Sequence, residues 1–335
     1  MPEFRRDIVT GKWVIVATER AKRPDKFTEP EKPQKERIKP NCPFCVGNER
    51  ETPPEVQSVR EPSTEPNTPG WRVRTVPNKF PALTPDGNAF EGEVGLYQTM
   101  SGVGVHEVII ESPAHDLSPG QLIVDEFEDV LVSYRKRYRA LAEDPRLKYV
   151  LIFRNHGKQA GASLEHPHSQ LIATPILPPV VAEELEGARC YFENTGRCVY
   201  CDMIREELRA GTRIVFQNDG FLVFEPFASR TPFETWILPR RHTPSFGDIS
   251  DGELRHLAEA MHLTLHRIFE ALNDPAYNYI IHTAPLRESD GEASYTHWHV
   301  EIMPKLTIAA GFEIGTGIFI NTATPEDTAM FLREA

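Results

Sequence analysis

The chain carries two copies of one pattern of cysteines and histidines, and this repeat limits its fold more than any other feature. Each copy opens with a Cys-x-x-Cys pair, continues with a single His, and ends with a His-x-His triplet. The surrounding segments also match, because His106 to His115 and Phe233 to His242 both have Glu in second place and His in last place. Two copies of one α+β unit are the simplest explanation of this order.

Hydrophobic patterns predict the same elements in both copies. Residues 121–143 carry apolar side chains at three- to four-residue intervals, which predicts a helix, and residues 251–272 are predicted to form its counterpart. Short runs rich in β-branched and aromatic residues predict strands on either side of each helix. These runs are WRVRTV, HEVIIES, YVLIFRN and SQLIAT in the first half, and FLVFEPF, FETWILP, YNYIIHT and HVEIMP in the second.

The length of 335 residues agrees with two domains. We predict an N-terminal domain over residues 1–180 and a C-terminal domain over residues 181–335. The connection between them is expected near residues 175–197, which link the last strand of the first copy to the Cys pair of the second. Residues 22–39 and 53–69 are rich in Pro and charged residues and are expected to form loops.

Charge and composition exclude several classes of function. The 37 Lys and Arg against 49 Asp and Glu give a net charge of −12 without a block of like charge, which argues against general binding of nucleic acid. No run of about 18 apolar residues and no leader segment are recognised, so we expect a cytoplasmic protein that does not enter a membrane. Five cysteines in such a chain favour metal ligation or free thiols over a disulfide framework.

The Cys and His residues of each copy form a complete Cys2His2 ligand set, which suits tetrahedral zinc. One alternative is that the thiols are buried core residues, and another is that one half has lost its metal. A separate cluster of His282, His299 and Glu301 is a further alternative for the end of the second copy. The predicted zinc ligands are Cys42, Cys45, His115 and His166 in the first half, and Cys198, Cys201, His242 and His297 in the second.

One histidine in the first half has the features of a nucleophile. If His166 binds metal, His168 lies free on the same face of the strand, because side chains alternate with period two. Gln170 points the same way and can donate its amide to a phosphoryl oxygen. Attack by an imidazole on phosphorus gives a covalent phospho-His intermediate. Three further residues of suitable size or polarity accompany this group: Asn155, Gly161 and Ser163.

These motifs together resemble the signature of the galactose-1-phosphate uridylyltransferases, within the histidine triad superfamily. The signature consists of Cys42-x-x-Cys45 and Asn155-x5-Gly161-Ala-Ser163-x2-His166-Pro-His168-x-Gln170, and the similarity extends over nearly the whole chain. The resemblance implies a duplicated histidine-triad fold, with an antiparallel sheet and helices in each half, that forms a homodimer. It also implies a ping-pong reaction in which His168 takes a uridylyl group from UDP-glucose, releases glucose 1-phosphate and passes the group to galactose 1-phosphate.

The same resemblance assigns roles to individual residues. The catalytic residues it implies are His168, Gln170 and Ser163. The substrate-binding residues it implies are Arg20, Arg23, Asn78, Asn155, Gly161, Ser163, Gln170, Phe312 and Ile314. Zinc would be structural, with one ion in each half and iron as an alternative in the second site. The expected partners are UDP-glucose and a hexose 1-phosphate, without nucleic acid or membrane.

Departures from the family pattern keep other functions open. The second Cys2His2 set is similar to that of a two-zinc branch that includes ADP-glucose phosphorylases, which transfer an adenylyl group to phosphate through the same His. The C-terminal segment GFEIGTGIFINTATPED lacks the Lys, Tyr and Glu of the galactose-specific pattern. The alternative function is therefore ADP-glucose phosphorylase. A more distant alternative is a zinc-stapled module that binds nucleotides without catalysis.

Overall fold

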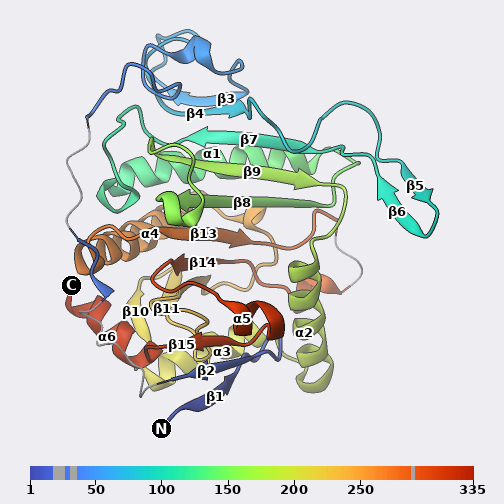
Figure 1. The fold of residues 1–335 in the computed structure, drawn as a ribbon, viewed down its shortest axis with the longest axis vertical. Helices are drawn as coiled ribbons and strands as arrows, with labels where there is room; N and C mark the ends of the chain where they lie inside the picture. The colour runs from blue at the N-terminus through green and yellow to red at the C-terminus, as the bar shows by residue number, and fades with distance from the viewer. Residues whose placement is uncertain (18–26, 31–35, 288–290) are drawn as a thin grey trace.

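The computed structural model describes residues 1–17, 27–30, 36–287 and 291–335, and its centre is one antiparallel sheet of ten strands (Figure 1). The strands are, in spatial order, β10 (Ile214–Gln217), β11 (Phe221–Phe224), β12 (Thr235–Pro239), β14 (His299–Pro304), β13 (Tyr277–His282), β8 (Tyr149–His156), β9 (His168–Thr174), β7 (Val105–Ile110), β4 (Trp71–Pro77) and β3 (Gln57–Arg60).

The order of the strands reveals the duplication. Outward from the middle of the sheet, the first half places β8, β9, β7 and β4, and the second half places β13, β14, β12 and β11 in the corresponding positions. The halves join where β8 and β13 pair in antiparallel fashion, from Tyr277 opposite His156 to Ile281 opposite Ile152. The predicted α+β fold with a repeated antiparallel unit is confirmed.

Two long helices cover one face of the sheet, one from each half. Helix α1 (Val124–Ala142) follows β7, helix α4 (Asp251–Leu272) follows β12, and the two pack against each other. Their apolar stripes form the main core together with the inward side chains of the sheet. Both helices were predicted from the sequence, and α4 has the predicted bounds. This core holds the strands that position the site on the opposite face.

The remaining elements lie around the second half and at one corner of the first. Strands β1 (Glu3–Arg6) and β2 (Trp13–Val16) form a small sheet with β15 (Phe319–Asn321), and β5 (Glu91–Val94) and β6 (Tyr97–Met100) form a hairpin that projects from the body (Figure 1). The other helices are α2 (Pro179–Thr195), α3 (Val199–Ala210), α5 (Gly311–Thr316) and α6 (Pro325–Glu334). Among the described residues, no helix has the length and apolar character needed to cross a membrane.

Most of the connection predicted over residues 175–197 is helical. Residues 179–195 form α2, and the second Cys pair does not lie in a loop, because Cys198 is the N-cap of α3 and Cys201 lies in its first turn. The predicted boundary between residues 180 and 181 falls in the first turn of α2 and stays a prediction. The N-terminal strands also form a sheet with β15, a strand near the C-terminus, so the first residues of the chain lie with the second half.

Candidate active site

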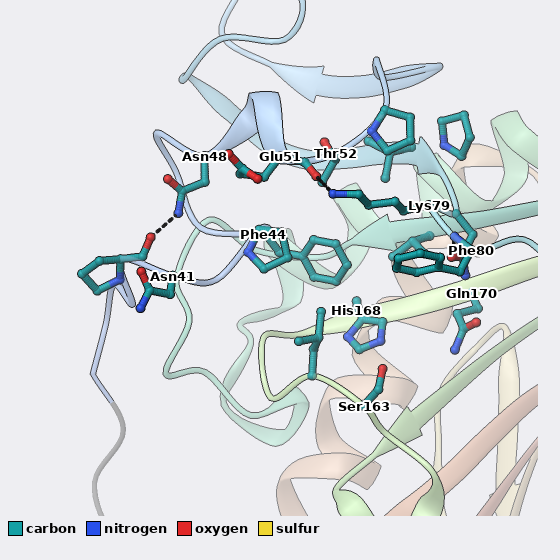
Figure 2. Close-up of a pocket in the computed structure, with 18 residues that line it drawn as sticks. Asn41, Phe44, Asn48, Glu51, Thr52, Lys79, Phe80, Ser163, His168 and Gln170 are labelled. Carbon is teal, nitrogen blue, oxygen red and sulfur yellow. Dashed lines mark hydrogen bonds between the residues drawn. The ribbon is translucent and has the colours of Figure 1, made fainter.

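A pocket of about 740 Å³ opens on the face of the sheet that α1 and α4 leave free (Figure 2). Its floor is formed by β9 and β7, and its wall by the loop that carries the first Cys pair. Among the predicted site residues, Asn78, Ser163, His168 and Gln170 line it. Side chains alternate along β9, so His168 and Gln170 face the pocket while Leu171 and Ala173 pack in the main core.

His168 is held as a neutral imidazole with one nitrogen free for the pocket. Its Nδ1 lies 2.8 Å from the carbonyl oxygen of His166, and since a carbonyl only accepts, Nδ1 carries the hydrogen. The Nε2 atom therefore keeps its lone pair. Burial lowers the pKa of His168 to about 4, so the ring is uncharged at neutral pH. The ring of Phe44 lies against it, with centroids 5.4 Å apart.

The loop between β8 and β9 brings Ser163 to the pocket, and its shape depends on two glycines. Gly157 and Gly161 both have positive φ, at 78° and 91°. A Cβ atom on Gly157 would also lie 2.8 Å from the Cβ atom of Ala276, so no larger residue fits without a shift of the backbone. The two glycines thus fix the path of the loop that carries Ser163.

Asn155, at the end of β8, is oriented by a residue of the other half. The Nδ2 atom of Asn278 donates to Oδ1 of Asn155 at 2.8 Å and to the carbonyl oxygen of Ala160 at 2.9 Å. Oδ1 of Asn155 accepts this hydrogen bond, and Asn155 is not among the residues that line the pocket. Gly161 lies beside this amide.

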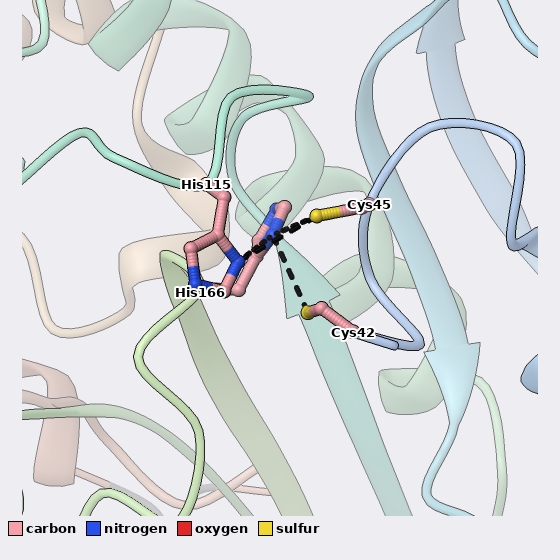
Figure 3. Close-up of side chains that lie close together, drawn as sticks. All are labelled: Cys42, Cys45, His115 and His166. Atoms are coloured by element: carbon pink, nitrogen blue, oxygen red, sulfur yellow. Dashed lines mark hydrogen bonds between the residues drawn. The ribbon is translucent and has the colours of Figure 1, made fainter. Parts of the chain in front are cut away.

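The first Cys2His2 set converges on one point (Figure 3). With metal–sulfur and metal–nitrogen bonds of about 2.3 and 2.0 Å, tetrahedral coordination separates S from N by about 3.5 Å and two N atoms by about 3.3 Å. Cys42 and Cys45 Sγ lie 3.8 and 3.6 Å from His166 Nδ1, and Cys45 Sγ lies 3.5 Å from His115 Nδ1. The two Nδ1 atoms are 3.3 Å apart. The donors and their spacing fit a tetrahedral metal.

The second set shows a similar geometry. Cys201 Sγ lies 3.4 Å from His242 Nδ1 and 3.6 Å from His297 Nδ1, and Cys198 Sγ lies 3.9 Å from His297 Nδ1. All four donor atoms lie within 4.8 Å of one another. Each half therefore brings together four residues that could hold a metal ion.

A backbone carbonyl fixes the tautomer of one histidine in each set. Nε2 of His166 lies 2.8 Å from the carbonyl oxygen of Ser112, and Nε2 of His297 lies 2.9 Å from that of Pro239. A carbonyl accepts, so Nε2 carries the hydrogen and Nδ1 presents its lone pair to the cluster. Burial also lowers the pKa of His166 to about 3, which keeps the ring neutral.

The second half contains a counterpart of the pocket with different chemistry. Register pairing places Trp236 and Glu301 opposite each other, as Val108 and Gln170 are opposite each other in the first half. The Trp236 ring stacks on His299, the counterpart of His168, at 5.0 Å. A carboxylate, that of Glu301, therefore takes the place of the Gln170 amide in this copy.

The alternative metal cluster of His282, His299 and Glu301 is also brought together. It contains its own counter-charges, because Glu184 accepts from His282 Nδ1 at 3.0 Å and Glu301 accepts from Arg230 at 2.6 Å. Burial alone would lower the pKa of His282, but the carboxylates of Glu184 and Glu301 raise it to about 9. The group is thus a buried, charge-compensated network around a protonated His.

Some predicted substrate residues do not reach the pocket in this chain. Phe312 and Ile314 lie on α5 beside β15, are exposed, and do not line the pocket (Figure 1). Asn155 and Gly161 lie nearer, at the end of β8 and in the loop before β9, but they do not line it either. Arg20 and Arg23 lie outside the described residues.

Sequence reasoning also missed residues that line the pocket, among them Phe44, Thr52 and Lys79. Phe44 lies between the two cysteines of the first set, and Lys79 lies next to Asn78 in the VPNKFP motif, so proximity to recognised motifs was the available signal.

Comparisons with known proteins cover the whole chain. A profile described as galactose-1-phosphate uridyl transferase, N-terminal domain, matches residues 1–178, and one of a domain of unknown function matches residues 106–332. The ADP-glucose phosphorylase of Arabidopsis thaliana is 40% identical over 99% of this chain and 93% of its own length. The galactose-1-phosphate uridylyltransferase of Thermotoga maritima is 31% identical over 100% of this chain and 98% of its own length.

Solved structures of the same two kinds of enzyme also match this chain over its whole length. An ADP-glucose phosphorylase from Arabidopsis thaliana with bound ADP-glucose matches with a TM-score of 0.83 and 36% identity, over 100% of this chain and 99% of that one. A uridylyltransferase structure matches with a TM-score of 0.77 and 30% identity, over 100% of this chain and 98% of that one.

Proposed function

The chain belongs to the galactose-1-phosphate uridylyltransferase family, and from this premise we propose that it transfers the nucleotidyl group of a sugar nucleotide through a covalent intermediate on His168. The observation that carries the proposal is the neutral His168, whose Nδ1–H is bound to a backbone carbonyl and whose Nε2 is free in a pocket of suitable size.

The residues of the pocket suggest a two-step reaction. Nε2 of His168 attacks the α-phosphorus, the bond from phosphorus to the bridging oxygen breaks, and the electron pair leaves with the sugar 1-phosphate. An oxygen of the acceptor phosphate then attacks the same phosphorus and returns the electron pair to Nε2. Gln170 and Ser163 would donate to the phosphoryl oxygens, and Asn78 and Asn155 would hold the nucleotide.

We propose zinc at both Cys2His2 sets, on the basis of their donors and spacing. Bound there, the ion acts as a structural cross-link and supplies no chemistry at phosphorus. Through His166, the first set would fix the start of β9 and with it His168.

The first candidate reaction uses UDP-glucose as donor and a hexose 1-phosphate such as galactose 1-phosphate as acceptor. The second candidate is an ADP-glucose phosphorylase, which transfers an adenylyl group to phosphate. A specific observation favours the second: identity is 40% to an ADP-glucose phosphorylase and 31% to a uridylyltransferase, each over almost the whole chain. Both candidates share the step at His168.

A homodimer is the third part of the proposal. Phe312 and Ile314 are exposed and lie outside the pocket of their own chain. If they bind substrate as the resemblance implies, they do so at the pocket of a second copy.

Intact-protein mass spectrometry after brief incubation with UDP-glucose or ADP-glucose, without acceptor, tests the proposal. We expect an added uridylyl or adenylyl group that is lost in His168→Asn, while that variant still binds nucleotide. The nucleotide that gives the adduct selects between the two candidates.

His266→Asn, a matched change on α4, serves as control and should keep the adduct. An adduct that persists in His168→Asn would remove His168 as nucleophile. A wild-type protein without an adduct from either nucleotide would refute the proposed function and favour a binding module.

A further inference from the structure

We propose that His106 is a positioning residue, whose Nε2–H holds the carboxamide of Gln170 so that its amide hydrogens face the phosphoryl group. The inference deepens the proposed function and rests on it for its role in catalysis. His106 is not part of the pocket lining, and its sequence context gave no indication of such a role.

The strand register brings the two side chains together. On β7, His106 pairs with Ile172 and Val108 pairs with Gln170, so His106 and Gln170 are diagonal neighbours on the same face of the sheet. Nε2 of His106 lies 2.8 Å from Oε1 of Gln170. The imidazole thus stands directly behind the amide that borders the pocket.

The tautomer of the His106 ring determines which atom donates in the hydrogen bond between His106 and Gln170. The backbone N–H of Ala82 donates to Nδ1 of His106 at 3.2 Å, so Nδ1 must carry a lone pair. A neutral imidazole with a lone pair on Nδ1 carries its hydrogen on Nε2. Nε2–H then donates to Oε1 of Gln170, and the NH2 group of Gln170 is left for the ligand.

Asn78 does not compete for this bond. Its Nδ2 lies 3.0 Å from Nε2 of His106, but its Oδ1 already accepts from the backbone N–H of Phe80 at 2.9 Å. Nδ2 of Asn78 and Nε2 of His106 are then both donors, so this contact is not a hydrogen bond. Asn78 offers no acceptor to Nε2–H. The oxygen of Gln170 is the acceptor that remains.

The other half of the molecule provides an internal comparison. By strand register, the counterpart of Gln170 is Glu301 and the counterpart of His106 is Glu234, since Glu234 is two residues before Trp236 as His106 is two before Val108. The register thus shifts the match of His106 with Phe233 in the sequence repeat by one residue. In the second half, Arg230 donates to both carboxylates at 2.6 Å. The His–Gln pair thus occurs in the half that contains His168, and an Arg–Glu network replaces it in the other half.

Two substitutions separate the two functions of the His106 ring. In His106→Asn, Oδ1 can replace Nδ1 as acceptor for Ala82, but the donor to Gln170 is lost. In His106→Gln, the amide nitrogen can replace Nε2 as donor, but the acceptor for Ala82 is lost. The readout is the single-turnover rate at which His168 becomes nucleotidylated, measured by mass spectrometry with UDP-glucose and with ADP-glucose.

We expect His106→Asn to slow this rate about tenfold or more and His106→Gln to stay within about threefold of wild type. In a Gln170→Ala background, His106→Asn should cause no further loss, because its effect passes through Gln170. Equal losses in both His106 variants, or a loss that persists without Gln170, would overturn the inference.

The ring tautomer gives a readout that needs no turnover. Nitrogen-15 chemical shifts of His106 in the wild-type protein should show hydrogen on Nε2 and a lone pair on Nδ1. Hydrogen on Nδ1 would overturn the inference whatever the activity. A wild type without any adduct would instead refute the proposed function, and the tautomer would still decide the orientation of Gln170.

Discussion

Hydrogen bonds from the surrounding protein orient three of the polar residues that we propose to act on the substrate. His168 depends on the carbonyl of His166, Gln170 on His106, and Asn155 on Asn278. In each case a hydrogen bond on the protein side selects the atom that is left for the ligand. The substitution of a supporting residue should therefore affect the reaction rate more than the fold.

We predict that Asn278→Ala affects the reaction rate more than the stability of the fold. The change removes the donor shared by Asn155 Oδ1 and the carbonyl of Ala160, so the Asn155 amide can rotate and the loop can shift. Activity should fall about tenfold through misplacement of the ligand, and the free energy of unfolding by about 1 kcal/mol. Steady-state kinetics and urea unfolding measure the two effects.

Asn194→Ala is the control for this prediction, because Asn194 is exposed and donates only to the carbonyl of Cys190 within α2. It should leave both quantities unchanged. Full activity in Asn278→Ala would show that Asn155 does not need this orientation.

The motif residues around His168 could be predicted because their spacing along β9 already places them on one face. The support residues could not. His106 acquires its role from a tautomer that the backbone of Ala82 imposes, and Asn278 comes from a strand of the other half. Neither relation is visible before the chain is folded.

At the scale of elements, the helix α4 begins with a capping arrangement whose strength depends on pH. Glu253 accepts from the backbone of Ser250 at 2.9 Å and from Arg241 Nε at 2.6 Å. The hydrogen bond from Arg241 lowers the pKa of Glu253 to about 2, although burial acts in the other direction. This contribution is complete above the ordinary pKa near 4.5 and is lost as the pH falls toward 2.

Glu253→Gln should therefore lower the free energy of unfolding by about 1 kcal/mol at pH 7, and the difference from wild type should shrink between pH 5 and pH 3. Urea unfolding at pH 7, 5 and 3.5 gives this comparison. Glu259→Gln on the same helix, 3.9 Å from Arg255, should have a small effect at every pH. A difference that stays constant with pH would contradict the assignment.

Each Cys2His2 set joins segments that are far apart in the chain. Cys42→Ser removes one ligand of the first set, so we expect the melting temperature to fall by about 5 °C or more and the rate to fall with it. Incubation of the wild type with a chelator should act in the same direction. Differential scanning calorimetry and metal analysis provide the measurements.

Cys190→Ser is the matched control, since Cys190 is exposed on α2 and belongs to neither set. Its melting temperature should equal that of wild type. If Cys42→Ser melts at the same temperature as Cys190→Ser, the first set holds no structural metal.

Most strands and both long helices could be predicted because each has a clear apolar pattern. The loop predicted over residues 53–69 is wrong in part, because residues 57–60 form β3 and pair with β4. Helix α2 could not, because it buries only Val181 and Ala188 fully along its length and begins with two prolines. A helix with such a narrow apolar contact gives little periodic signal. The position of the second Cys pair at the start of α3 could not be predicted either, since the Cys-x-x-Cys spacing alone does not distinguish a loop from the first turn of a helix.

At the scale of the whole molecule, exposed apolar side chains agree with the proposed homodimer. The β5–β6 hairpin extends from the body and exposes Val94, Leu96 and Tyr97, and an isolated two-stranded hairpin has little stability of its own (Figure 1). Light scattering after size-exclusion chromatography should give about twice the chain mass of 38.0 kDa.

Complementation tests whether the second copy takes part in the site. His168→Asn and a Phe312→Ala/Ile314→Ala double variant should each have little activity, and mixed dimers should regain part of it, because one site per dimer then combines intact residues from both chains. Activity that does not return in mixed dimers, while the mass stays that of a dimer, would contradict substrate contacts across subunits.

The pairing of β8 with β13 has a consequence for how the chain is made on the ribosome. The outer edge of β8 is complete well before its partner, because β13 begins only at Tyr277. Until then, the first half presents an unpaired strand edge to water and to other nascent chains, which is a template for aggregation. Synthesis of this protein should therefore depend more on chaperones than refolding of the finished chain does. Translational pausing before residue 277 should increase aggregation.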